Sequence, residues 1–64
     1  MKRVLYDGIE WTAVQATQPG VCFCNGRKKP FLKGDWILTR QEDALEMKAI
    51  LTASEFERDC KVLA

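Results

Sequence analysis

Apolar and polar residues alternate in short runs near the start of the chain, and a turn dipeptide separates the first two runs. Residues 4–6 are apolar and stop at Asp7-Gly8, after which residues 9–16 alternate and place Ile9 and Trp11 on one side. A period of two predicts strands, and Asp-Gly predicts a tight hairpin between them. We therefore expect an N-terminal hairpin in which Trp11 is buried.

A third strand is expected at residues 21–24, between the turns Gln18-Pro19-Gly20 and Asn25-Gly26. Its two cysteines would share one face, and Val21 and Phe23 would share the other. Because both faces are then apolar, the pattern predicts a strand that is covered on both sides, with its phenylalanine in the core.

The segment 27–30 is polar, and its proline disfavours a central strand, so we expect a loop there. Phe31 returns the chain to the core before the turn Lys33-Gly34-Asp35. Residues 36–39 are apolar and β-branched enough to predict another strand.

Residues 40–51 fit two structures on local grounds. High helix propensity, with Thr39 and Glu42 placed for a capping box, favours a helix. Alternation of apolar and polar residues over 45–51 favours a strand instead, with 41–43 as the polar tip of a hairpin. The local pattern alone leaves both open.

The C-terminal segment has a clearer pattern, typical of a short helix. Thr52-Ala53-Ser54-Glu55 matches a capping box and predicts a helix over residues 55–63. Phe56, Cys60 and Leu63 then fall on one helical face. A helix this short is not stable alone and must pack on the sheet.

These elements predict one mainly β domain of the α+β class that spans residues 1–64. We expect a small antiparallel sheet, or a partly open barrel, of four to five strands with one short C-terminal helix. A composition of 47% hydrophobic and 30% charged residues excludes a disordered chain. No apolar run reaches the ~20 residues of a membrane span and no signal-peptide pattern is present, so we expect a cytoplasmic protein without membrane contact.

The ten basic and nine acidic residues are unevenly distributed along the chain. Residues 1–32 hold five basic and two acidic groups, whereas residues 33–64 hold five basic and seven acidic groups. The densest charge is Arg27-Lys28-Lys29, which suggests either a nucleic-acid contact or a solvated surface. A pI near 7.7 is below the range above 9 that is typical of a basic binding domain.

The cysteines point to packing rather than to chemistry. Cys22, Cys24 and Cys60 are odd in number, and the chain has no histidine. Structural zinc usually needs four Cys or His ligands, and a nucleophilic cysteine needs a base. We therefore expect no enzyme activity, no metal and no cofactor, and three reduced thiols.

Two segments resemble a family of small phage and prophage proteins. Residues 11–15 resemble an early strand with the pattern veAvqW, and residues 34–38, Glu46 and Phe56-Glu57 resemble a later PGDYIV…GE…FE pattern. Lys33 replaces the proline of that pattern. The resemblance implies a strand, a hairpin and a short final helix in the second half, and so favours strand for residues 40–51. It implies no catalytic residue, and phage proteins of this size often inhibit host machinery.

The expected function is that of a non-enzymatic, phage-type accessory protein that binds and inhibits a host protein or complex. The alternative is a small β-barrel that binds nucleic acid through the basic segment 27–29 and nearby aromatic residues. A homodimer is a further option, because so small a β domain leaves an apolar edge exposed. The residues expected to bind a partner are Arg27, Lys28, Lys29, Trp36, Glu42 and Asp43.

Overall fold

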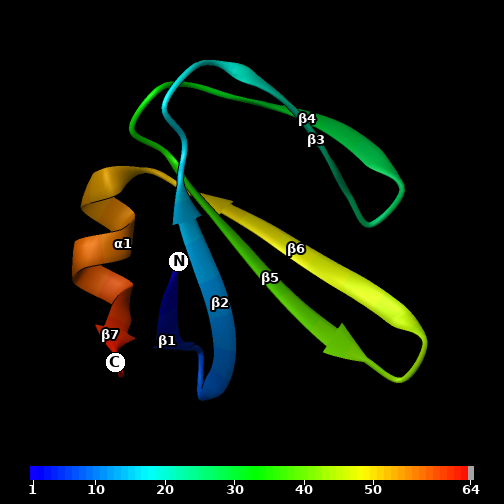
Figure 1. Ribbon diagram of the computed structural model, residues 1–64, viewed down its shortest axis with the longest axis vertical. Helices are drawn as coiled ribbons and strands as arrows, with labels where there is room; N and C mark the ends of the chain where they lie inside the picture. The colour runs from blue at the N-terminus through cyan, green and yellow to red at the C-terminus, as the bar shows by residue number, and fades with distance from the viewer. Residues whose placement is uncertain (64) are drawn as a thin grey trace.

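The structure is a computed structural model that describes residues 1–63, in which seven strands and one helix are formed. In chain order these are β1 (Lys2–Tyr6), β2 (Ile9–Gln15), β3 (Gly20–Cys24), β4 (Arg27–Phe31), β5 (Trp36–Glu42), β6 (Leu45–Leu51), α1 (Ala53–Asp59) and β7 (Cys60–Val62). Five strands make one antiparallel sheet in the order β6-β5-β2-β1-β7, and β3 pairs only with β4. The expected mainly β domain with one short helix is confirmed, and its sheet is not closed into a barrel (Figure 1).

The N-terminal hairpin forms at the predicted turn. Asp7 and Gly8 both have positive φ angles, of 54° and 75°, as a two-residue turn of this kind requires. Val4 lies opposite Trp11 in the ladder, and both side chains are buried. The indole Nε1 of Trp11 donates a hydrogen bond of 3.3 Å to the carbonyl oxygen of Tyr6. The prediction that Trp11 is buried is confirmed.

Residues 40–51 form strands rather than a helix. Residues up to Glu42 continue β5, and β6 pairs with it so that Leu38 lies opposite Ala49. Leu51, at the end of β6, lies opposite Trp36 and is part of the hydrophobic core. The turn falls at Asp43-Ala44, with Asp43 at a φ of 54°, one residue later than the expected tip.

The C-terminal helix begins as expected and ends early. The capping box is present: Thr52 Oγ1 accepts from the Glu55 backbone N–H at 3.2 Å, and Glu55 Oε1 accepts from the Thr52 N–H at 2.9 Å. The predicted end at residue 63 is wrong, because the helix stops at Asp59 and residues 60–62 become β7. There they pair with β1, an edge that would otherwise be unpaired, and Leu63 is 41% exposed.

The hydrophobic core lies between α1 and one face of the five-stranded sheet. Val4, Ala13 and Leu38 are fully buried there, and Phe56 of α1 closes the core from the helix side. Figure 1 shows α1 alongside this sheet and the β3–β4 hairpin as a separate arm above β5 and β6. The hairpin is the only pair of strands outside the sheet in residues 1–63.

The β3–β4 hairpin is inserted between two neighbouring strands, β2 and β5. Its base is closed by backbone hydrogen bonds from Ala16 N to Asp35 O at 2.8 Å and from Gly34 N to Ala16 O at 2.9 Å. Beyond this base the hairpin has its own turn at Asn25-Gly26, with φ angles of 53° and 79°. The β3–β4 hairpin therefore lies within the connection between the paired strands β2 and β5, and it can carry a surface of its own.

The expected loop at residues 27–30 is strand β4. Pro30 lies opposite Val21, and Arg27 lies opposite Cys24 next to the two-residue turn. Because hydrogen-bonded and non-hydrogen-bonded pairs alternate from such a turn, Pro30 falls at a non-hydrogen-bonded position where its missing N–H costs no ladder bond. The proline excludes a central strand, as expected, but it is compatible with this edge.

Candidate binding surface on the hairpin

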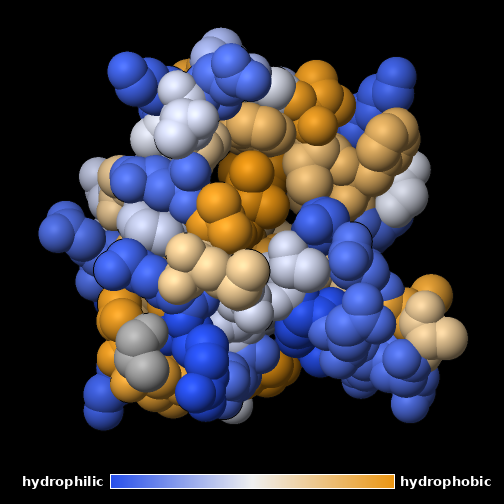
Figure 2. All heavy atoms as spheres, in the orientation of Figure 1, coloured by the Kyte–Doolittle hydropathy of each residue, from blue (hydrophilic) through white to orange (hydrophobic). Residues whose placement is uncertain are grey.

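The outer face of the hairpin is defined by Val21, Phe23, Lys28 and Pro30, which share one side of the two strands. Val21 is 59% exposed and Phe23 is 62% exposed. The Lys28 ammonium lies 5.9 Å from the centre of the Phe23 ring. Figure 2 shows hydrophobic side chains over the hairpin region, next to hydrophilic ones.

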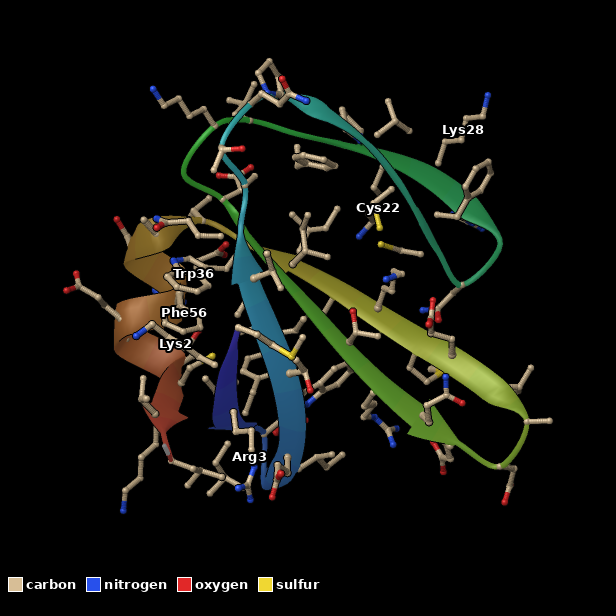
Figure 3. The ribbon with its side chains drawn as sticks, viewed as in Figure 1. Lys2, Arg3, Cys22, Lys28, Trp36 and Phe56 are labelled. Atoms are coloured by element: carbon tan, nitrogen blue, oxygen red, sulfur yellow. The ribbon has the colours of Figure 1, made fainter. Side chains whose placement is uncertain are left out.

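The expectation that Phe23 is buried is wrong. The hairpin forms a two-stranded sheet of its own, so only one of its faces can pack on the rest of the molecule. That face carries the cysteines, and Figure 3 shows Cys22 directed toward the sheet and Lys28 directed away from it. The apolar residues of the other face are left to solvent, which the alternation within β3 could not reveal.

The inner face of the hairpin consists of Gly20, Cys22, Cys24, Arg27, Lys29 and Phe31. Cys24 is only 5% exposed, and burial raises the pKa of its thiol, with a further rise from the adjacent Cys22. The nearby ammonium groups of Lys29 and Lys48 lower this pKa without cancelling the rise. Cys24 is therefore a protonated, packed thiol rather than a nucleophile.

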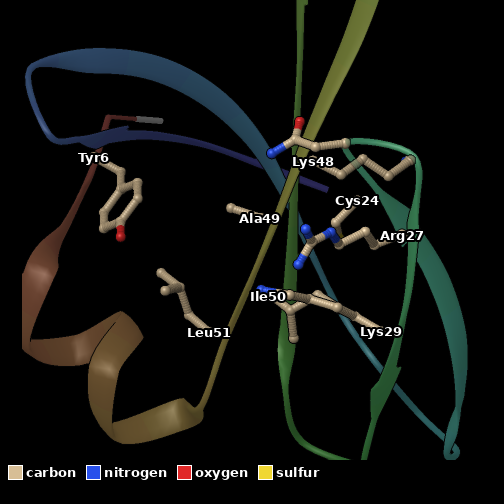
Figure 4. A pocket seen from close by; sticks show the side chains of 9 residues that line it. Tyr6, Cys24, Arg27, Lys29, Lys48, Ala49, Ile50 and Leu51 are labelled. Carbon is tan, nitrogen blue, oxygen red and sulfur yellow. The ribbon is translucent and has the colours of Figure 1, made fainter.

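A pocket of about 590 Å³ lies between the inner face and the edge strand β6 (Figure 4). Arg27 and Lys29 line it from β4, and Lys48 lines it from β6. Ile50 and Leu51 supply an apolar part of its wall. The pocket therefore combines three cationic groups with an apolar wall.

The three basic residues that were expected to act together are split by the strand. Because side chains alternate along β4, Arg27 and Lys29 point to the pocket, and Lys28 points to the outer face. Lys48, which the sequence analysis did not single out, joins the first two. The alternation of apolar and polar residues over 45–51 predicted that Lys48 lies on the solvent side of a strand. It lies beside Arg27 and Lys29 because the hairpin packs on β6.

Positive charge is concentrated on the hairpin in space as well as in sequence. Residues 16–34 contain four basic residues and no acidic one, whereas the rest of the chain contains six basic and nine acidic residues. Within residues 1–63, Arg27, Lys28 and Lys29 form no ion pair. The hairpin is thus an uncompensated cationic arm on a slightly acidic body.

The other expected binding residues lie elsewhere. Trp36 is half-buried and stacks on Phe56, beside Lys2 and the helix (Figure 3). Glu42 and Asp43 are exposed at the β5–β6 turn, where Glu42 pairs with Arg40 at 2.7 Å. The six residues therefore occupy four separate places, two of them on opposite faces of the hairpin, and do not form one site.

The three cysteines are free thiols, and residues 1–63 contain no group of three or more His, Cys, Asp or Glu side chains arranged to hold a metal ion. Over the same residues, no helix is long and apolar enough to cross a membrane. In comparisons with protein-family models, with curated proteins and with solved structures, none matches this chain. The candidate surface therefore stands on its own geometry.

Proposed function

We propose that this protein is a non-enzymatic binding module that docks on a partner protein through the outer face of the hairpin and inhibits that partner by covering its surface. The observation that carries the proposal is the exposure of Val21 and Phe23, at 59% and 62%, on an arm with four basic residues and no acidic one. A partner that fits has an apolar patch with acidic residues around it.

The use of the aromatic residues favours a protein partner over nucleic acid. Trp11 is buried, and Trp36 is stacked on Phe56 at 4.0 Å between ring centres. Tyr6 packs edge-on against Trp11, and Phe31 is half-buried under Gly20. Only Phe23 is freely presented, whereas a single-strand platform stacks successive bases on several rings.

The aliphatic part of the surface supports the same proposal. Val21 shares the outer face with Phe23, and Leu32, just beyond β4, is 68% exposed. Aliphatic side chains gain by desolvation against another apolar surface and have no base to stack on. The resemblance to small phage proteins is the reason to look for that partner among host proteins.

Nucleic acid remains the second candidate, because Lys28 lies beside the exposed Phe23 ring and no acidic residue opposes the charge of the hairpin. The dependence of the binding affinity on salt concentration distinguishes the two candidates. Contact with phosphates makes the logarithm of the affinity fall with the logarithm of the salt concentration, by about 0.7 to 0.9 per phosphate contact. Replacing Arg27, Lys28 and Lys29 with Ala would then remove most of the binding of a single-stranded oligonucleotide.

The test compares three immobilised proteins: the natural sequence, Phe23→Ser and the matched control Leu45→Ser. Leu45 is 68% exposed and lies outside the hairpin, beside the β5–β6 turn. A host protein retained by the natural sequence and by Leu45→Ser is then purified, and its dissociation constant is measured. We expect Phe23→Ser to weaken binding at least tenfold while the fold is retained.

Two outcomes would overturn the proposal. One is a partner that binds Phe23→Ser as tightly as it binds the natural sequence. The other is sedimentation showing a dimer of this chain that Phe23→Ser dissociates, because the outer face would then be covered by a second copy rather than by a host protein.

A further inference from the structure

We propose that the pocket between the hairpin and β6 binds a small organic phosphate, whose phosphate group is held by Arg27, Lys29 and Lys48. This site uses the inner face of the hairpin, so it is separate from the docking surface on the outer face. Three cationic residues line this pocket beside an apolar wall, and two of them, Arg27 and Lys29, form no ion pair within residues 1–63.

The fold brings the three cations together from strands far apart in sequence. Arg27 and Lys29 are two residues apart on β4 and so share one side of it, and Lys48 lies across the pocket on β6. Figure 4 shows Arg27 and Lys29 reaching from β4 toward β6. Like charges gathered around one pocket repel one another, and an anion bound between them would relieve this repulsion.

The net positive charge of the pocket matches a doubly charged anion. Lys48 Nζ donates to Thr39 Oγ1 at 3.1 Å and lies 3.5 Å from Glu46 Oε1, so its position is fixed and its charge is partly offset. Arg27 and Lys29 have no carboxylate partner within residues 1–63. About two positive charges are therefore uncompensated, which matches a phosphate monoester.

The donor groups that line the pocket are of the kinds that bind phosphate oxygens. A guanidinium offers a planar pair of N–H groups to two oxygens, and an ammonium offers a compact charge. Asn25, at the turn of the hairpin, also lines the pocket and brings an amide N–H₂ donor. Phosphate is therefore better matched than a carboxylate, which has fewer acceptor oxygens and one charge.

The apolar wall of the pocket predicts that the bound phosphate carries an organic group. Ile50, Leu51 and the ring of Tyr6 line the pocket beside the cations, and about 590 Å³ is within the range of small-molecule sites. An inorganic ion would leave this apolar part in contact with water. The nearby Cys24 is buried and the chain has no histidine, so the ligand would be held without being transformed.

The experiment is a titration of the ¹⁵N-labelled full chain with phenyl phosphate, followed by NMR. We expect saturable shifts of the amide signals of Asn25, Arg27 and residues 48–51. Arg27→Ala and Lys29→Ala should each weaken binding roughly tenfold or more, since hydrogen bonds to charged groups are strong. Lys28→Ala is the matched control, because it removes the same charge from the outer face and should change binding less than threefold.

Several results would overturn this proposal. These are the absence of saturable shifts at millimolar phenyl phosphate, an equal loss of binding in Lys28→Ala, and equally tight binding of inorganic phosphate. Tighter binding of a single-stranded oligonucleotide at the same residues would assign the cations to nucleic acid instead. Phe23→Ser should bind phenyl phosphate normally, so the fate of this site and that of the docking surface are distinguishable.

Discussion

The indole of Trp36 lies flat on the phenyl ring of Phe56, with ring centres 4.0 Å apart and planes inclined by 8°. Trp36 is the first residue of β5, and Phe56 is the buried residue of α1. This pair attaches a helix of seven residues, too short to be stable alone, to the sheet. Trp36 therefore has a structural partner within the chain, which explains why it is not part of the hairpin surface.

Phe56→Ala should destabilise the fold by about 3–5 kcal/mol, because it removes a buried ring and leaves a cavity beside Trp36. Urea denaturation followed by tryptophan fluorescence measures this change. Glu57→Ala, at the exposed neighbouring position, is the control and should change stability by less than about 0.5 kcal/mol. Equal stability of the two variants would show that α1 is not held by this contact.

Gly20→Ala should loosen the hairpin while leaving the five-stranded sheet intact. A Cβ at Gly20 would lie 2.6 Å from Phe31 Cζ, so the ring must swing away from the strand. Overpacking of this kind costs about 1–3 kcal/mol. Hydrogen exchange should become faster in β3 and β4 only, and adding Phe31→Leu should restore slow exchange. Unchanged exchange in the hairpin would show that the Phe31 ring does not pack under Gly20.

Cys24 should be alkylated more slowly than Cys22. Burial raises the pKa of the Cys24 thiol, so at any pH below that raised value it holds less of the reactive thiolate. Its rate should therefore rise at a pH above the value of about 8.5 that is usual for a free thiol. Iodoacetamide labelling between pH 7 and 10, with mass spectrometry of each peptide, measures both rates. Preferential labelling of Cys24 at pH 7 would contradict its burial on the inner face of the hairpin.

Local signals in the sequence were enough to predict the turns and the start of the helix. Asp7-Gly8, Asn25-Gly26 and the capping box of Thr52 with Glu55 each depend on residues within one turn of the chain. The strands at residues 40–51 depended on more than local propensity. The pairing of β6 with β5 over residues 36–51 makes them strands, which the local pattern left open.

The errors came from contacts between distant segments. Residues 60–62 leave the helix because β1 offers them an unpaired edge, and Phe23 is exposed because its hairpin lies outside the main sheet. Lys48 joins Arg27 and Lys29 only through the packing of the hairpin on β6. None of these features can be predicted from ten consecutive residues, and each of them determines which residues the candidate surfaces contain.

The most direct test of the docking surface is site-specific photo-crosslinking at position 23. Benzoylphenylalanine replaces Phe23 in one sample and Leu45 in another, and each protein is irradiated in an extract of host cells. We predict one crosslinked host protein at position 23, displaced by excess unmodified protein, and none at position 45. Crosslinking of the same protein at position 45 with none at position 23 would contradict docking through the outer face of the hairpin.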